Sequence, residues 1–194
     1  MPRSSDSRTR MVAAAARLFR AQGYPATGWR QVAAEAEAPW GSQAHHFPGG
    51  KQQLGVEAIS RSGAGFERAI RAAFAGVHPA DAVRLWVRAA SAELSASGWR
   101  DGCPVATVAL ETAHSSDVLA DACAEALGSW RAALAEALTS HGMPESEAAS
   151  LAALMLAAIE GALIMARAER AVTPLELVGD ELAALLRARI GEHL

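Results

Sequence analysis

Apolar positions along this chain recur at three- and four-residue steps, the spacing that places side chains on one face of an α-helix. The clearest series lies near the C-terminus and consists of Leu175, Val178, Leu182, Leu185, Leu186 and Ile190. The alternation of apolar and polar residues that predicts strands is nearly absent, and alanine, a strong helix former, is abundant. We therefore predict an all-α protein.

Glycine and proline residues divide these helical patterns into nine segments. We expect helices over residues 6–22, 28–35, 39–46, 51–76, 80–96, 103–113, 116–140, 145–171 and 174–192. The first three are close together and short, and the later ones are long enough to form a bundle. The pattern predicts a three-helix N-terminal domain over residues 1–50 and a helical-bundle domain over residues 51–194.

Several helix ends carry recognisable local signals. Gly23 is placed to end the first helix in a left-handed conformation, and Thr27 to cap the second. Thr173-Pro174-Leu175-Glu176 has the pattern of a capping box at the start of the last helix. Phe47, at the end of the third short helix, is expected in the core of the N-terminal domain.

The last two helices each show a broad apolar surface. Ala148–Ala166 approaches the length that spans a membrane, but it contains Glu160 and many weakly hydrophobic alanines, so we interpret it as a buried helix. Ala157 and Gly161, four residues apart, would let another helix approach closely. Two such helices from each of two subunits would form a four-helix homodimer interface; the alternative is that both complete a monomer core.

Charge is distributed unevenly along the chain. The first fifty-one residues carry seven Lys/Arg and three Asp/Glu, a net +4, whereas the remaining 143 residues carry a net −7, which gives −3 for the whole chain. A cationic end on a small protein predicts contact with a polyanion. Two cysteines and no N-terminal secretion signal favour a reducing cytoplasm.

Two short helices joined by a tight turn have the geometry that places a recognition helix in the DNA major groove. The residues here are Gly23-Tyr24-Pro25-Ala26-Thr27, Val32-Ala33 and Gly41-Ser42, followed by His45-His46-Phe47-Pro48-Gly49-Gly50-Lys51. They resemble the tetracycline-repressor (TetR) family, and the doubled glycine is similar to its LmrA-like subgroup. Gly102-Cys103-Pro104-Val105-Ala106, Leu110-Glu111 and Glu160-Gly161-Ala162-Leu163 resemble the second domain of the same subgroup.

The resemblance implies a homodimeric transcriptional repressor that binds a palindromic double-stranded operator and is released by a small, hydrophobic effector. As a DNA-binding regulator the protein would be cytoplasmic and associated with the nucleoid. The residues themselves offer no Ser/His/Asp set, nucleotide-binding fingerprint or metal-ligand cluster, so we expect no cofactor, catalytic residue, metal or membrane partner. The candidate DNA-binding residues are Thr27, Arg30, Trp40, Gly41, Ser42, Gln43, His45, His46 and Lys51. Ser42 and Gln43 are suited to bases and Lys51 to a phosphate, the histidines to a phosphate or to packing, and Arg30 to a base edge or to solvent.

The third helix departs from the family. Trp40 stands where relatives commonly have lysine, and Gln43-Ala44 replaces a leucine-tyrosine pair. Trp40 is suited to stacking on a sugar, contacting a thymine methyl or packing on the preceding helix. These losses motivate an alternative function, a ligand-binding or scaffold dimer without sequence-specific DNA binding. The arm from Arg3 to Arg10 would compensate electrostatically.

The bundle has a few large polar and aromatic residues that would orient an effector in an apolar cavity. The candidates are Trp86, Trp99, Glu111, His114, Trp130 and Glu160. Glu111-Thr112-Ala113-His114 also has the Glu-x-x-His spacing of di-iron and di-manganese bundles, which would make the protein a metal-dependent enzyme. That chemistry needs the motif twice, and it occurs once, so we expect no enzyme.

Overall fold

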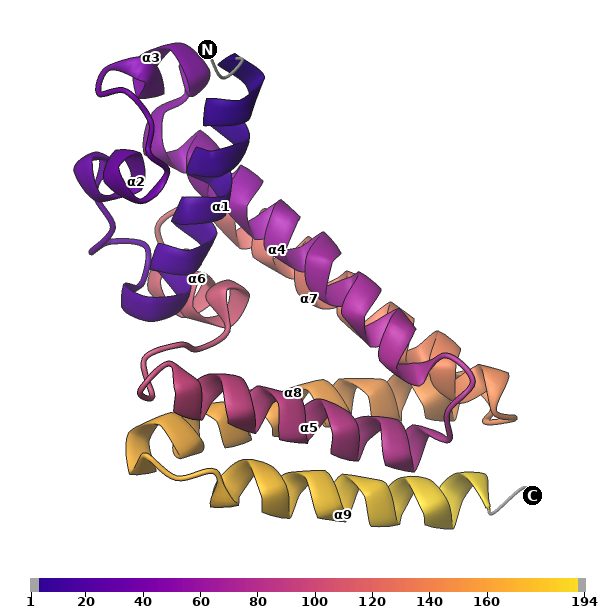
Figure 1. The fold of residues 1–194 in the computed structure, drawn as a ribbon. Helices are drawn as coiled ribbons and strands as arrows, with labels where there is room; N and C mark the ends of the chain where they lie inside the picture. Colours follow the sequence, from indigo (N-terminus) through magenta and orange to yellow (C-terminus); the bar gives the residue numbers. More distant parts are fainter. Residues whose placement is uncertain (1–3, 192–194) are drawn as a thin grey trace. The chain divides into compact units, whose positions relative to one another are not determined.

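The computed structural model describes residues 4–191, and over this range the chain forms α-helices and no strand (Figure 1). The helices are α1 (Ser4–Gln22), α2 (Trp29–Glu35), α3 (Ser42–His46), α4 (Gly50–Phe74), α5 (Pro79–Ala96), α6 (Pro104–Thr112), α7 (Asp117–Ser140), α8 (Glu145–Glu169) and α9 (Thr173–Ile190). The all-α prediction is confirmed. Each predicted helix is present, with ends that differ by three residues at most.

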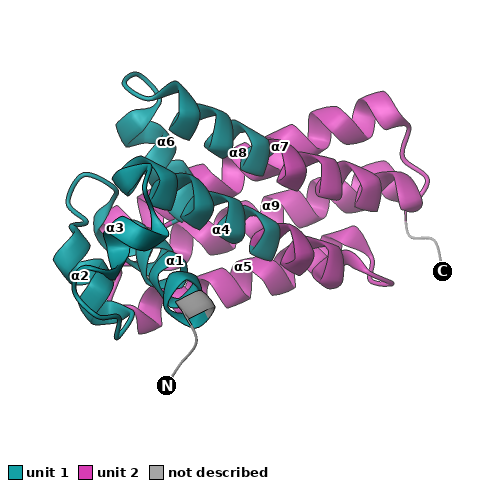
Figure 2. Ribbon diagram, turned by 90° about the horizontal axis from the view of Figure 1, so that it is seen from above, with its two compact units in different colours: residues 1–65, 103–127 teal, residues 66–102, 128–194 magenta. Residues whose placement is uncertain are grey.

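The helices form two compact units (Figure 2). The first contains residues 1–65 and 103–127, and the second contains residues 66–102 and 128–194. Both α4 and α7 therefore contribute to each unit. α6 packs with the N-terminal helices, although it lies far from them in sequence. The domain boundary at residue 50 stays a prediction.

The core of the first unit is built around α1. Met11, Ala15 and Phe19 have no exposed surface and, four residues apart, lie on one face of this helix. α1 packs against both α2 and α6. Phe47 is 2% exposed, which confirms its predicted place in the core, and α4 contributes Leu54. These contacts hold the short helices α2 and α3 in place, because neither is long enough to be stable alone.

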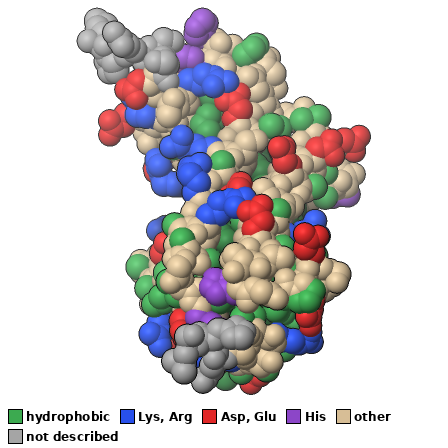
Figure 3. Space-filling view, turned by 90° about the vertical axis from the view of Figure 1, so that its right-hand side faces the viewer, with side chains coloured by type: hydrophobic (Ala, Val, Ile, Leu, Met, Phe, Trp, Pro, Cys, Tyr) green, Lys and Arg blue, Asp and Glu red, His purple; other side chains and the backbone are tan. Residues whose placement is uncertain are grey.

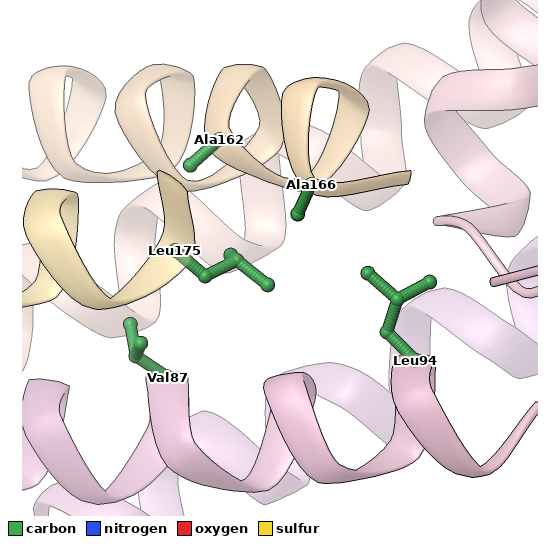
Figure 4. Packing of buried hydrophobic residues seen from close by; sticks show 5 residues of the cluster. All are labelled: Val87, Leu94, Ala162, Ala166 and Leu175. Carbon is green, nitrogen blue, oxygen red and sulfur yellow. The ribbon is translucent and has the colours of Figure 1, made fainter. Parts of the chain in front are cut away.

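In the second unit, α9 packs against both α5 and α8. Val87 and Leu94 of α5, Ala162 and Ala166 of α8 and Leu175 of α9 point toward one another in a buried cluster (Figure 4). The two alanines allow the α8 backbone to lie close to its neighbours. Three aromatic residues add to this core. The ring centroid of Phe66 lies 4.5 Å from that of Trp130 and 5.4 Å from that of Trp86.

Two predicted caps are wrong. The N-cap of α2 is Gly28, and Gln31 Oε1 accepts a 3.0 Å hydrogen bond from its N–H, so Thr27 does not cap this helix. The N-cap of α9 is Val172, without a side-chain cap bond, and the proposed capping box around Thr173 does not form. In both cases backbone hydrogen bonds start the helix one residue away from the expected position.

α8 is long and apolar enough to cross a membrane by length and composition. Core helices of soluble proteins share these properties. One side of α8, from Ala148 to Ala166, is buried within the second unit. Leu154, Ile164 and Met165 are exposed on the same helix. The prediction of a buried helix is therefore confirmed for one face, and the other face remains apolar and uncovered.

Candidate nucleic-acid interface

The turn between α2 and α3 depends on Gly41. Its φ of +97° lies in the left-handed region, which residues with a Cβ rarely adopt. No atom lies within 4 Å of the position where a Cβ would be, so backbone conformation rather than crowding requires glycine here. The exposed turn brings the N-terminus of α3 to the surface of the first unit.

The two predicted base-reading residues of α3 are engaged locally. Gln43 Oε1 accepts a 2.8 Å hydrogen bond from the Gly41 N–H, and the Ser42 hydroxyl donates one of 2.7 Å to the Pro39 carbonyl. Both side chains are half-buried. Each such bond contributes only about 1 kcal/mol. The side chains can therefore exchange these partners for a base edge at little cost.

Arg30 and Trp40 form a pair on the surface. The Arg30 guanidinium carbon lies 5.8 Å from the centroid of the Trp40 ring, within the range of a cation–π contact. Arg30 is exposed, and 63% of the Trp40 surface is exposed. The structure thus brings together two of the predicted DNA-binding residues.

His45 and His46 end α3, with their ring centroids 5.3 Å apart. His45 is exposed and His46 half-buried. Partial burial lowers the pKa of His46, and the nearby His45 and Arg8 lower it further. In the part of the chain that the structure describes, no group of three or more His, Cys, Asp or Glu side chains is arranged to hold a metal ion.

Lys51 lies in the first turn of α4, as predicted, and packs against the turn after α1. Its ammonium nitrogen lies 4.4 Å from the centroid of the Tyr24 ring and donates a 3.3 Å hydrogen bond to the Pro25 carbonyl. Burial lowers the pKa of Lys51, and Glu111 acts in the opposite direction. The amine remains partly exposed, so a phosphate oxygen could approach it.

Thr27 is a structural residue in this arrangement. Only 1% of its surface is exposed, and its hydroxyl donates a 2.7 Å hydrogen bond to the Gly23 carbonyl. Gln22 Nε2 donates to the same hydroxyl at 3.3 Å. The side chain therefore holds the turn between α1 and α2 and does not face the surface.

Basic residues of α1 are paired with carboxylates. Arg8 contacts Glu57 at 2.6 Å, Arg10 contacts Asp6 at 2.5 Å, and Arg17 contacts Glu35 at 3.0 Å. On the face drawn in Figure 3, blue Lys/Arg and red Asp/Glu side chains are interspersed. Exposed ion pairs of this kind contribute at most about 1 kcal/mol each. Arg10 Nε also donates a 2.8 Å hydrogen bond to the Ala36 carbonyl. The residues of the predicted arm before Ser4 lie outside the described range.

The predicted effector residues are divided between the units. Trp86, Trp99, Trp130 and Glu160 belong to the second unit, and Glu111 and His114 to the first. Trp130 is 1% exposed and packs against Phe66, and Trp99 packs beside the buried α5–α8–α9 cluster. Glu160 is half-buried, and His114 is exposed.

Glu111 has a role that sequence patterns do not indicate. Its Oε2 accepts a 2.7 Å hydrogen bond from the Tyr24 N–H, which lies 87 residues earlier. A Cβ at Gly23 would collide with this carboxylate. This hydrogen bond links α6 to the turn after α1 within the first unit. Nothing in the Glu-x-x-His spacing could have predicted this partner.

Known proteins resemble both parts of the chain. Residues 11–58 match the family described as bacterial regulatory proteins, tetR family, and residues 79–181 match the C-terminal domain of LmrA/YxaF-like transcriptional regulators. The uncharacterized HTH-type transcriptional regulator YxaF of Bacillus subtilis is 34% identical over 97% of this chain and 100% of its own length.

A second relative and a solved structure agree with these matches. The HTH-type transcriptional regulator LmrA of Bacillus subtilis is 34% identical over 94% of this chain and 97% of its own length. The crystal structure of regulatory protein TetR from Rhodobacter sphaeroides has the same fold, with a TM-score of 0.81 and 23% identity over 92% of this chain and 97% of that chain.

Proposed function

Because this chain belongs to the TetR family of bacterial transcriptional regulators, we propose that it represses transcription as a homodimer bound to a palindromic operator. A small hydrophobic effector would release it from DNA. The observation that carries the proposal is the exposed Arg30–Trp40 pair beside the left-handed Gly41 turn, at the start of the recognition helix. DNA would lie against this surface in the cytoplasm.

The proposed contacts follow from what each exposed group offers. Arg30, Trp40, Ser42 and Gln43 would face base edges in the major groove, and His45 would contact a phosphate. Lys51, next to the Tyr24–Pro25 turn, would add a cation for a phosphate. The paired arginines of α1 would exchange carboxylate partners for DNA phosphates, which predicts affinity that falls steeply with salt.

The uncovered apolar face of α8 supports the homodimer. Leu154, Gly161 and Met165 are spaced seven and four residues apart, so they lie along one face of the helix, and Ile164 adjoins it. Leu154 is 51%, Ile164 57% and Met165 46% exposed. No atom lies within 4 Å of a Cβ built at Gly161, which leaves room for a second helix. A second copy of the chain would cover this face.

Effector release requires a connection between sensing and DNA binding. α4 begins at the proposed interface, next to Lys51, and continues into the second unit, which contains the buried Trp130. A ligand that favours a different position of α4 would change the separation of the two recognition helices. Effector and operator would then weaken each other's binding by the same factor.

A mobility-shift assay with DNA flanking the protein's own gene tests the proposal. The expected result is a complex that specific DNA competes away and random DNA does not, and that weakens as salt rises. Equal affinity for random DNA would contradict it and favour the scaffold alternative. An effector that binds equally well with and without operator would contradict the release mechanism.

A further inference from the structure

The fold brings together two side chains that are ten residues apart in the sequence. Arg30 extends from the first turn of α2, and Trp40 lies in the turn before α3. The guanidinium carbon lies 5.8 Å from the indole centroid, and both residues are exposed. An arginine held over a ring keeps a narrower set of conformations than a free one, so less entropy is lost when it binds.

Trp40 is much more exposed than Trp29, the other tryptophan of the N-terminal helices. Trp29 packs with its ring centroid 5.7 Å from Phe47 and is half-buried. Trp40 leaves 63% of its surface in solvent, beside a cation. A large aromatic surface is stabilised when a partner covers it. The pair therefore offers a ligand two features: the hydrogen-bond donors of the Arg30 guanidinium and the flat apolar surface of the Trp40 indole.

These two features match two features of the major groove. Guanine presents two acceptors, O6 and N7, to an arginine fork, whereas adenine presents one acceptor and one donor. Thymine alone among the unmodified DNA bases presents a methyl group there. With the fork on one base pair, the indole, whose centroid lies 5.8 Å from the guanidinium carbon, would reach a neighbouring pair, because successive pairs are about 3.4 Å apart.

We propose that Arg30 and Trp40 act as one reader of a guanine adjacent to a thymine in each operator half-site. Arg30 donates to guanine O6 and N7, and the Trp40 ring covers the thymine methyl. The inference rests on the proposed DNA-binding function and adds the identity of two base pairs. It assigns the unusual Trp40 to operator specificity rather than to packing.

The experiment begins with the full-length protein and a library of random duplexes. Selected operators are expected to contain guanine next to thymine in each half-site. In one half-site, uracil then replaces that thymine, which removes only the methyl, and 7-deazaguanine replaces that guanine, which removes only N7. We expect binding about fourfold weaker with uracil and about fivefold weaker with 7-deazaguanine.

Variants assign each effect to its residue. The Trp40→Ala variant should bind the uracil and thymine duplexes with about equal affinity. The Arg30→Ala variant should likewise bind the 7-deazaguanine and guanine duplexes with about equal affinity. Because the side chains support each other, the double variant should lose less affinity than the product of the two single losses. Arg88→Ala, which removes an exposed arginine of α5 in the second unit, serves as the control and should retain both penalties.

The outcomes separate this inference from the function on which it rests. If no sequence is enriched, the proposed function fails and the base-pair assignment fails with it. If an operator is enriched but lacks guanine next to thymine, or if uracil leaves wild-type affinity unchanged, only the assignment is overturned. The base-analogue measurements use the wild-type protein, so they do not depend on the folding of any variant.

Discussion

Glu111 shows how one side chain fixes the geometry of the first unit. Its carboxylate accepts the Tyr24 N–H at 2.7 Å, in the turn that follows α1, a helix that contributes Met11 and Phe19 to the buried core. A charged acceptor makes this bond stronger than one between neutral groups. The nearby Lys51, stacked on the Tyr24 ring, adds a favourable charge. Glu111 thus stabilises the turn against which the proposed phosphate-binding lysine packs.

Replacing this carboxylate should lower stability. Glu111→Gln keeps the size but removes the charge, and we expect the free energy of unfolding to fall by about 1 kcal/mol; Glu111→Ala, which leaves the Tyr24 N–H without its partner, should cost about 2 kcal/mol. Urea denaturation measures both. Glu125→Gln, on the exposed face of α7, is the control and should change stability by less than about 0.5 kcal/mol. Equal effects of Glu111→Gln and Glu125→Gln would refute this role.

The two cysteines should differ in reactivity. Cys123 is 2% exposed, and burial raises the pKa of its thiol from 9.0 to about 11, whereas Cys103 is half-buried at the N-cap of α6. We expect iodoacetamide at pH 8 to modify Cys103 first and Cys123 only after unfolding, as followed by mass spectrometry, because the thiolate is the reactive form. Equal rates in the folded protein would contradict the placement of Cys123.

The same pKa difference predicts how Cys123 affects stability with pH. The folded-state pKa lies above the unfolded one, so folding disfavours the thiolate. Its contribution to stability is fully present below pH 9 and is lost as pH rises toward 11. A Cys123→Ser variant should show a smaller loss of stability over this range.

At the scale of helices, sequence patterns predicted most of what is observed. Apolar periodicity and the glycine and proline breaks gave every helix, because these residues act through local backbone conformation. The pattern predicts a start of α3 three residues too early, because the Ser42 N–H and hydroxyl both donate to the Pro39 carbonyl and form a turn there. Hydrogen bonds of this kind compete with a helix and are not visible in periodicity.

Contacts between distant helices could not be predicted in the same way. Periodicity indicates which face of a helix is buried but not which helix covers it. The packing of α6 against α1, and with it the Glu111–Tyr24 bond, therefore came only from the structure. In the candidate DNA site, the residue types indicated Arg30 and Trp40, but their contact and the burial of Thr27 depend on tertiary packing.

The packing of α4 on α7 gives a prediction at this scale. A Cβ at Gly63 would lie 2.8 Å from the Ala126 Cβ, closer than carbon atoms pack, whereas a Cβ at Gly128 meets nothing within 4 Å. Gly128→Ala should therefore stabilise the protein by about 0.5–1 kcal/mol through helix propensity. Gly63→Ala should destabilise it by about 1–3 kcal/mol through crowding. Thermal unfolding measures both changes, and a stabilising Gly63→Ala would show that the helices are farther apart.

For the whole molecule, the apolar face of α8 predicts how the chain assembles. Leu154→Asp places a charge in the proposed interface and should convert the dimer to a monomer in analytical ultracentrifugation. The affinity for the operator should fall as the dimer dissociates, because a monomer contacts only one half-site and binds it weakly. Leu85→Asp, at a position 55% exposed on α5, is the matched control and should leave the mass unchanged. A monomeric wild-type protein, or a dimeric Leu154→Asp variant, would exclude this face as the interface.

The most direct test of the account is the selection of bound sequences from random duplexes by the full-length protein, with the spacing of the enriched half-sites as the readout. Two recognition helices related by dimer symmetry predict inverted repeats whose centres lie about 34–36 Å, or one duplex turn, apart. Enrichment of such repeats is the expected result. Enrichment of unpaired sites, or of no sequence at all, would contradict a symmetric repressor that reads DNA through α3.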